Sequence, residues 1–324
     1  MIGAWLRLPE GWRAVLALWG VILVLFAVGG LVSPGFFSVS QAGAIFRSAS
    51  FIGLAAMGQT LAILIGGIDL SVGPLVTLGN VFCCLMLAGR DENNLWAVTA
   101  ILLIGLAAGT LNGLGASLLG ISPMVMTLAT GAIVTGAVLI YSQGAPTGNA
   151  SPLLRAVGVG FTWSIPNSVL IWLILGTALA LVLKFTSFGR GVYYVGANET
   201  AAVFSGLRVN LIKIAVYALS GLTAAFTGII IAGYTSVAFV AAGRDYPMQS
   251  IAAAVIGGVS MTGGRGGYGG AAAGAVLLCL IESLLTNLNM QEPGRKIMNG
   301  LTIIVLIAFY YRKSLGSGRS RPAN

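Results

Sequence analysis

The chain has no histidine and very little charge. Among its 324 residues, only 8% are Asp, Glu, Lys or Arg. Without histidine, the sequence cannot supply histidine general acid–base catalysis, a Ser-His-Asp triad, an HExxH zinc site or a histidine ligand to haem. The three cysteines lie in apolar runs and have neither metal-ligand nor disulfide spacing, so we interpret them as packed helix residues.

The scarcity of charge also excludes a soluble domain, in which about 25% of residues are usually charged. Here 57% of residues are hydrophobic and the mean hydropathy is +0.96. The 47 glycines suit helices that approach one another closely in a membrane. A formal charge of +9 would suggest nucleic-acid binding in a soluble protein, but basic residues of membrane proteins report topology. We therefore predict an all-α integral membrane protein that binds no nucleic acid.

Ten apolar runs are candidates for crossing the bilayer, which takes about 20 residues each. They are 14–32, 43–65, 72–89, 95–118, 123–142, 168–186, 211–233, 247–262, 268–288 and 297–311. The runs 247–262 and 297–311 are short enough to be re-entrant or tilted. Ten spans leave no room for a soluble domain, so we predict that residues 1–324 form one transmembrane domain.

The distribution of basic residues predicts the orientation of these spans. With both termini inside, the cytoplasmic side holds eleven Lys and Arg residues and the other side holds six. Cytoplasmic loops retain Lys and Arg, so we predict cytoplasmic termini and a basic cytoplasmic tail at 312–324.

The segment 66–74 interrupts two apolar runs with glycines, a proline and a carboxylate. Its candidate helix-breaking and translocation residues are Gly66, Gly67, Asp69, Ser71 and Gly73, followed by Pro74. A carboxylate at mid-membrane costs about 3 kcal/mol on insertion scales, so Asp69 needs a role. Asp69 and Ser71 either cap the following helix or contact substrate directly. In both cases we predict a non-helical joint at the cytoplasmic end of two spans.

The loop 187–210 is the most polar stretch inside the protein. Asn198 is a candidate N-cap, Glu199 suits the first turn of a helix, and Gly206 can end it. These residues predict a cytoplasmic helix of about two turns that carries Ala201 and Ala202. An isolated helix of this length is marginal in water, so it docks either on the bilayer or on a cytoplasmic partner.

A second glycine-rich segment follows at 256–267. Its candidate hinge residues are Gly257, Gly258, Gly263 and Gly264. No Gly-Lys-Ser/Thr is present, so the chain has no Walker A motif and we predict that it does not hydrolyse ATP itself. The stretch Ile256-Gly257-Gly258 also echoes Ile65-Gly66-Gly67. Glu282 is a second acid in an apolar run, placed either near an interface or facing a cavity.

Together these segments resemble the permease subunits of bacterial ABC importers for ribose, xylose and arabinose. The string GGIDLSVG at 66–73 is similar to that family's most recognisable motif, and AAAVIGG at 252–258 is similar to a further block. The ATPase-coupling loop of the family resembles a third set, made of Gly189, Arg190, Tyr193, Gly196, Asn198, Glu199, Ala201, Ala202 and Gly206. One departure is Tyr246-Pro247-Met248-Gln249, which lacks the two acids usual there and suggests an unusual substrate.

The resemblance implies an ABC importer permease fold in a multi-pass protein of the bacterial inner membrane. It implies a second permease, identical or different, a cytoplasmic ABC ATPase that binds ATP-Mg, and a periplasmic sugar-binding protein. This chain would need no cofactor of its own, and residues 189–206 would receive the motion of the ATPase.

Two other classes compete with this interpretation. An ion-coupled transporter or channel would need acids within the membrane, for which only Asp69 and Glu282 qualify. A membrane enzyme would need a catalytic constellation, and the sequence offers no histidine, metal-ligand cluster or cofactor motif.

Overall fold

The computed structural model describes residues 10–298, 300–301 and 304, almost all of them in helices or the turns between helices. The longer helices are α2 (Glu10–Val32), α3 (Val39–Leu64), α4 (Val72–Leu87), α5 (Asn94–Leu118), α6 (Pro123–Tyr141), α8 (Asn167–Phe185), α11 (Val209–Thr235), α12 (Tyr246–Ile256) and α13 (Tyr268–Asn287). The shorter elements are η1 (Pro34–Phe37), η2 (Asp91–Asn93), α7 (Pro152–Val159), β1 (Phe161–Thr162), β2 (Ile165–Pro166), α9 (Ser187–Ala197) and α10 (Glu199–Phe204).

Within the described residues, five helices are long and apolar enough to cross a membrane. They are α5 with the preceding η2, α6, α8, α11 and α13. These helices agree with the predicted runs 95–118, 123–142, 168–186, 211–233 and 268–288. The predicted run 297–311 and the basic tail 312–324 lie mostly or wholly outside the described residues.

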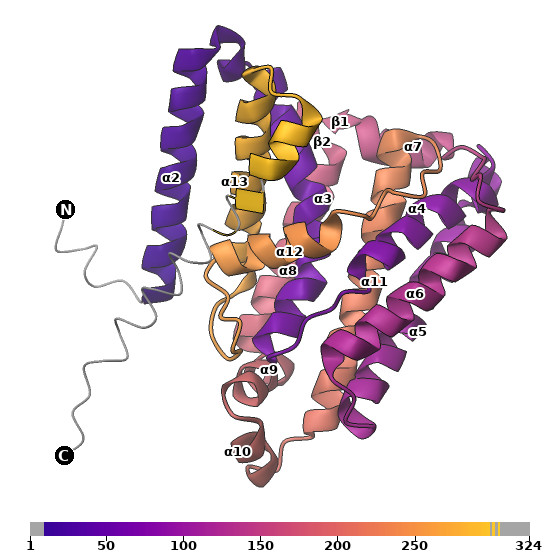
Figure 1. The fold of residues 1–324 in the computed structure, drawn as a ribbon, viewed down its shortest axis with the longest axis vertical. Coiled ribbons are helices and arrows are strands. Elements are labelled where there is room, and N and C mark those ends of the chain that lie inside the picture. The colour runs from indigo at the N-terminus through magenta and orange to yellow at the C-terminus, as the bar shows by residue number, and fades with distance from the viewer. Residues whose placement is uncertain (1–9, 299, 302–303, 305–324) are drawn as a thin grey trace.

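Two predicted spans are shorter than the bilayer. Helix α4 has 16 residues and α12 has 11, so their lengths are about 24 and 17 Å at 1.5 Å per residue. The hydrocarbon layer is about 30 Å thick. In Figure 1 the segment 65–71 runs from the lower end of α3 back up to the start of α4, and α12 lies at mid-height. The helix in the predicted run 72–89 is therefore shorter than a full span, and α12 fits the prediction that the run 247–262 is short enough to be re-entrant or tilted.

Helix α11 forms the centre of the bundle, packed against α3, α4 and α5. Glycines make this packing close. A Cβ on Gly228 would overlap Val76 O of α4, and one on Gly221 would overlap Gly105 O of α5. Such small residues let helix backbones approach where lipid provides no hydrophobic driving force. Cys83, Cys84 and Cys279 are buried and free, as predicted.

The two ends of the bundle differ in their connections (Figure 1). At one end, called here the α7 end, α7 and the hairpin β1–β2 join α6 to α8. At the opposite end, called here the coupling end, α9 and α10 join α8 to α11. The prediction of a loop with one short helix at 187–210 is therefore incomplete, because residues 187–197 are also helical.

Candidate functional site

Three predicted motifs meet at the coupling end of the bundle. Gly264 N donates a hydrogen bond of 2.9 Å to Leu64 O, which joins the loop after α12 to the last turn of α3. Gly196 of α9 lies against both groups, since a Cβ on it would overlap Leu64 O and approach Gly264 N at 2.6 Å. Gly263, at φ +84°, lies beside Gly66 N. The segments around residues 66, 196 and 264 therefore form one junction, called here the glycine junction.

Tyr193 adds a side-chain link to this junction. Its hydroxyl donates a hydrogen bond of 2.8 Å to Gly266 O, so α9 is tied to the loop 257–267 over 73 positions of sequence. Burial raises the pKa of Tyr193 above its ordinary value, so the hydroxyl keeps its proton and remains a donor. Gly189, one turn earlier, packs closely against the end of α8 near Leu183.

The two helix breaks at the junction have the same cap. In α3, Gly67 N bonds to Ala62 O and Gly66 N bonds to Ile63 O. In α12, Val259 N bonds to Ala254 O and Gly258 N bonds to Val255 O. Both are Schellman motifs with a left-handed glycine, Gly66 at φ +81° and Gly258 at φ +86°. The predicted echo is therefore structural, but its register differs by one residue, because Gly66 corresponds to Gly258.

Helix α10 follows the junction and begins as predicted. The Oδ1 atom of Asn198 accepts a hydrogen bond of 2.9 Å from Ala201 N, and Gly206 adopts φ +79° just beyond the end of the helix. Glu199 pairs with Lys213 of α11, which fixes α10 to the bundle. The helix has six residues, slightly fewer than the two turns predicted.

One face of α10 is buried and the other is open. Ala202 is 3% exposed and faces the bundle, while Phe204 and Val203 are 87% and 54% exposed. Ala201 and Arg190 are exposed. The last two residues of α10 are thus apolar side chains that the rest of the chain leaves uncovered.

Asp69 lies in a buried polar network rather than on a surface. Its Oδ1 accepts hydrogen bonds of 2.9 Å from Ser71 N and 2.5 Å from Ser71 Oγ, and its Oδ2 accepts one of 2.7 Å from Ser220 Oγ. Asn112 Nδ2 donates to Ser71 Oγ at 2.9 Å. Asp69, Ser71, Asn112 and Ser220 have no exposed surface. The network holds the 65–71 segment to α5 and α11.

These contacts show which residues of 66–74 cap a helix, break one or pack closely. Asp69 accepts the N–H of Ser71, the residue before α4, in a turn, and the side chain of Ser71 accepts no backbone N–H, so neither side chain bonds to an N–H group of α4 itself. Gly73 and Pro74 do not break the helix, since both lie in the first turn of α4. Gly73 instead permits close approach, because a Cβ on it would lie 2.7 Å from Gly243 O.

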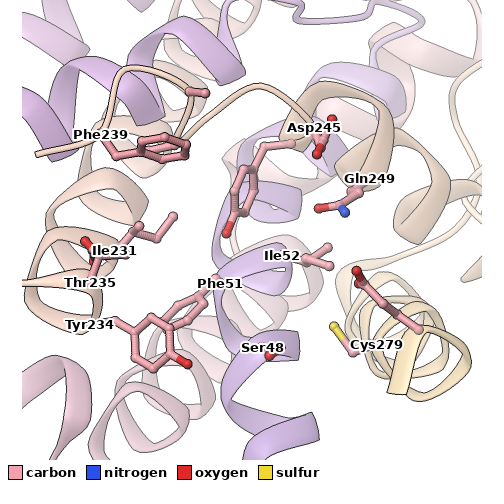
Figure 2. Close-up of a pocket in the computed structure, with 14 residues that line it drawn as sticks. Ser48, Phe51, Ile52, Ile231, Tyr234, Thr235, Phe239, Asp245, Gln249 and Cys279 are labelled. Atoms are coloured by element: carbon pink, nitrogen blue, oxygen red, sulfur yellow. Dashed lines mark hydrogen bonds between the residues drawn. The ribbon is translucent and has the colours of Figure 1, made fainter. Parts of the chain in front are cut away.

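A cavity of about 320 Å³ opens between α3, α11, α12 and α13, and no sequence motif indicated it. Figure 2 shows Phe51 and Tyr234 on one side of it and Asp245 and Gln249 on the other. Glu282 also lines this cavity. Of the two positions that the sequence left open for Glu282, the structure therefore favours the one facing a cavity. The full lining is Ser48, Phe51, Ile52, Ile231, Tyr234, Thr235, Phe239, Ala241, Ala242, Asp245, Tyr246, Gln249, Cys279 and Glu282.

The cavity lies in the half of the bundle toward the α7 end. Arg47 of α3, one residue before Ser48, donates to Val159 O of α7 at 3.2 Å. Gly158 of α7 packs against the backbone of Gly233 and Tyr234. A signal in the sequence could have indicated part of the site, because Glu282 is an acid within an otherwise apolar run.

Comparison with known proteins identifies the family. The protein-family model described as "Branched-chain amino acid transport system / permease component" matches residues 41–308 of this chain. The ribose import permease of Escherichia coli K12 is 35% identical to this chain, and that of Haemophilus influenzae is 33% identical. Each match covers 88% of this chain and 90% of the relative's length.

An autoinducer 2 import permease of Yersinia pseudotuberculosis is 32% identical over 89% of this chain and 82% of its own. No solved structure matches the chain. These relatives confirm the resemblance that the motifs predicted, and they are permeases rather than enzymes. The chain therefore belongs to the family of branched-chain amino acid transport system permease components and is a multi-pass membrane permease subunit.

Proposed function

We propose that this chain is the permease subunit of an ABC importer that moves a monosaccharide or related polyol across the bacterial inner membrane. The observation that carries the substrate class is the identity of 32–35% to ribose import permeases over 88–90% of the chain. In this proposal a separate ATPase binds ATP-Mg and supplies the energy, and this chain holds no cofactor. A periplasmic binding protein delivers the sugar, and a second permease, identical or different, completes the pathway.

The glycine junction supports a route for the motion of the ATPase. Helix α10 presents Phe204 outward, and Glu199–Lys213 fixes the helix to α11. Helix α9 then contacts the end of α3 and the loop after α12 through Gly196 and Tyr193. Because α12 and α4 start inside the bundle, a displacement at the coupling end moves short helices rather than whole spans. The residues of 189–206 would thus receive the motion, and the glycines of 66–73 and 257–264 would transmit it.

The proposal also includes the arrangement in the membrane. The chain has ten membrane segments, of which α4 and α12 are partial, and one transmembrane domain extends over residues 1–324. Both termini and the coupling end face the cytoplasm, in agreement with the excess of Lys and Arg on that side.

Co-purification tests the partner on which the proposal depends. The tagged chain is expressed with its neighbouring genes, extracted in mild detergent and analysed for a stoichiometric ATPase. The variant Phe204→Asp places a charge on the exposed contact face and is expected to lose most of the ATPase, at least tenfold. Trp163→Asp is the matched control, because Trp163 is also an exposed aromatic residue, at 91%, but lies at the α7 end. Equal recovery of ATPase with both variants would contradict the proposed docking.

A further inference from the structure

The cavity at the α7 end is not part of the glycine junction and has unusual electrostatics for a membrane protein. Two carboxylates, Asp245 and Glu282, line it together with the amide of Gln249. Among the described residues, neither carboxylate receives a hydrogen bond or forms a salt bridge. An acid in a membrane protein is normally paired or points into a water-filled functional space. Both carboxylates therefore face the cavity, and their oxygens are available to accept hydrogen bonds from a solute.

The lining contains no lysine or arginine. Arg47, a cation close to the site, stacks 4.7 Å from the Phe161 ring centroid and 5.8 Å from that of Tyr234, and it donates to Val159 O. It is not a lining residue. An anionic solute would thus meet two uncompensated negative charges, whereas a hydroxyl group could donate to either carboxylate.

The rest of the lining suits the carbon face of a small solute. Phe51 and Tyr234 pack with ring centroids 5.2 Å apart, and Phe239 and Tyr246 add further rings. Small-molecule sites combine such apolar walls with a few placed polar groups. At about 320 Å³ the cavity is near the lower end of the usual range for such sites, which starts at about 300 Å³, so it fits one sugar ring.

A polar groove continues from the cavity. It has a volume of about 260 Å³ between α3 and α13 and shares Ser48, Cys279 and Glu282 with the cavity. Its other polar residues are Gln41, Ser283 and Thr286, and Gln41 Nε2 donates to Ser283 Oγ at 2.7 Å across the two helices. Hydroxyl and amide groups thus line a continuous route in which Glu282 stands at the shared wall.

We propose that this cavity is a binding site for a single uncharged sugar ring, in which Asp245 and Glu282 accept its hydroxyl protons and repel anionic analogues. The site rests on the proposed function and extends it, because the permease itself then selects against phosphorylated or acidic sugars. Gln249 would contribute an amide contact, and the rings of Phe51 and Tyr234 would cover the carbon face of the sugar.

Charge-selective thiol labelling tests the site in the purified full chain, without any ATPase. Ser48 is exposed at the cavity wall, so Ser48→Cys places a reactive thiol there. A cationic methanethiosulfonate reagent is expected to react about tenfold faster than an anionic one of similar size. In the further variant Asp245→Asn with Glu282→Gln, that ratio should fall to near one. Thr235→Cys is the substitute if Ser48→Cys does not fold. The unsubstituted chain gives the background from the native cysteines, among them Cys279 in the cavity wall, and its rate is subtracted.

Protection by sugar tests occupancy. D-ribose at tens of millimolar is expected to slow labelling at position 48 severalfold, and D-ribose 5-phosphate is expected to leave it unchanged. Ser205→Cys, directly after α10 at the coupling end, is the control and should not be protected. Equal rates for the two reagents, absence of protection by ribose, or equal protection by its phosphate would each overturn the proposal. Loss of the ATPase in co-purification leaves these readouts intact, so the two proposals fail separately.

Discussion

At the scale of single residues, close backbone contacts at the coupling end depend on the absence of a side chain. Gly196 lies where Leu64 O and Gly264 N meet, and any Cβ there would overlap the carbonyl. The neighbours are backbone atoms joined by a hydrogen bond, so they cannot give way as a flexible side chain would. Replacement of Gly196 by a larger residue must therefore displace α9 or break the hydrogen bond that joins α3 to the loop after α12.

We predict that Gly196→Ala lowers the apparent melting temperature of the detergent-purified chain. Overpacking of this kind costs about 1–3 kcal/mol, which corresponds to a drop of roughly 3–10 °C. Gly136→Ala is the control, because Gly136 is in helix α6 with open space around its Cβ position and the change there is neutral or slightly stabilising. Equal melting temperatures for both variants would show that the glycine junction is not tightly packed.

Asp69 gives a second prediction for a single residue. The prediction distinguishes a structural role of Asp69 from a role in binding substrate or a coupling ion. Asp69→Ala leaves Ser71 N and the hydroxyls of Ser71 and Ser220 without their acceptor in a buried site. Each such group costs about 1–3 kcal/mol, so we expect melting to fall by roughly 5–10 °C or more. Asp245→Asn, at an exposed and unpaired carboxylate, should melt like the original chain. A stable Asp69→Ala protein that no longer transports would instead assign Asp69 to substrate or ion.

At the scale of elements, the length of the apolar runs predicted the long helices well, because a bilayer demands about 20 apolar residues whatever the fold. The same criterion placed a full span at 72–89, where α4 has only 16 residues, and it identified 247–262, the run of the 11-residue α12, as short. Gly66 ends α3 with a cap before α4 begins, and Gly258 caps the end of α12 itself, so each run contains less helix than its apolar length suggests. Helix α9 was missed because its sequence, SFGRGVYYVGA, is rich in glycine, which disfavours an isolated helix. Contacts with α3 and α8 supply the missing stability.

The sites were predictable to different degrees. The residues of the glycine junction stand in three recognisable motifs, although nothing in a single sequence shows that 66, 196 and 264 meet. The cavity escaped prediction because its polar groups come from four helices and a loop, each contributing one or two residues. Only the tertiary packing brings Ser48, Asp245 and Glu282 together.

The element prediction concerns the link between α9 and the loop 257–267. Tyr193→Phe removes the hydrogen bond to Gly266 O and keeps the ring, so α9 should transmit motion less faithfully. A hydrogen bond of this kind is worth about 1 kcal/mol, so sugar uptake per ATP hydrolysed in the reconstituted importer should fall about fivefold. The adjacent Tyr194→Phe is the control, since Tyr194 is 60% exposed and should transport normally. Unchanged coupling in Tyr193→Phe would remove this link from the proposed route.

At the scale of the whole molecule, the two ends must face opposite sides of the membrane for the proposed importer to work. The coupling end carries α10, whose exposed Phe204 would meet the ATPase, and the α7 end carries the cavity that would receive the sugar. The balance of basic residues predicts that the coupling end is cytoplasmic. This assignment does not depend on the identity of the sugar.

Side-specific labelling measures the orientation directly. Ser205→Cys, at the coupling end, is expected to react with a membrane-impermeant maleimide in inside-out vesicles and to stay unlabelled in intact spheroplasts. Trp163→Cys, exposed at the α7 end, should show the reverse pattern. Because the two positions lie on opposite ends of one rigidly packed bundle, each serves as the control for the other. If Ser205→Cys were labelled only from outside, a cytoplasmic ATPase could not reach α10, and the positive-inside bias would have failed for this chain.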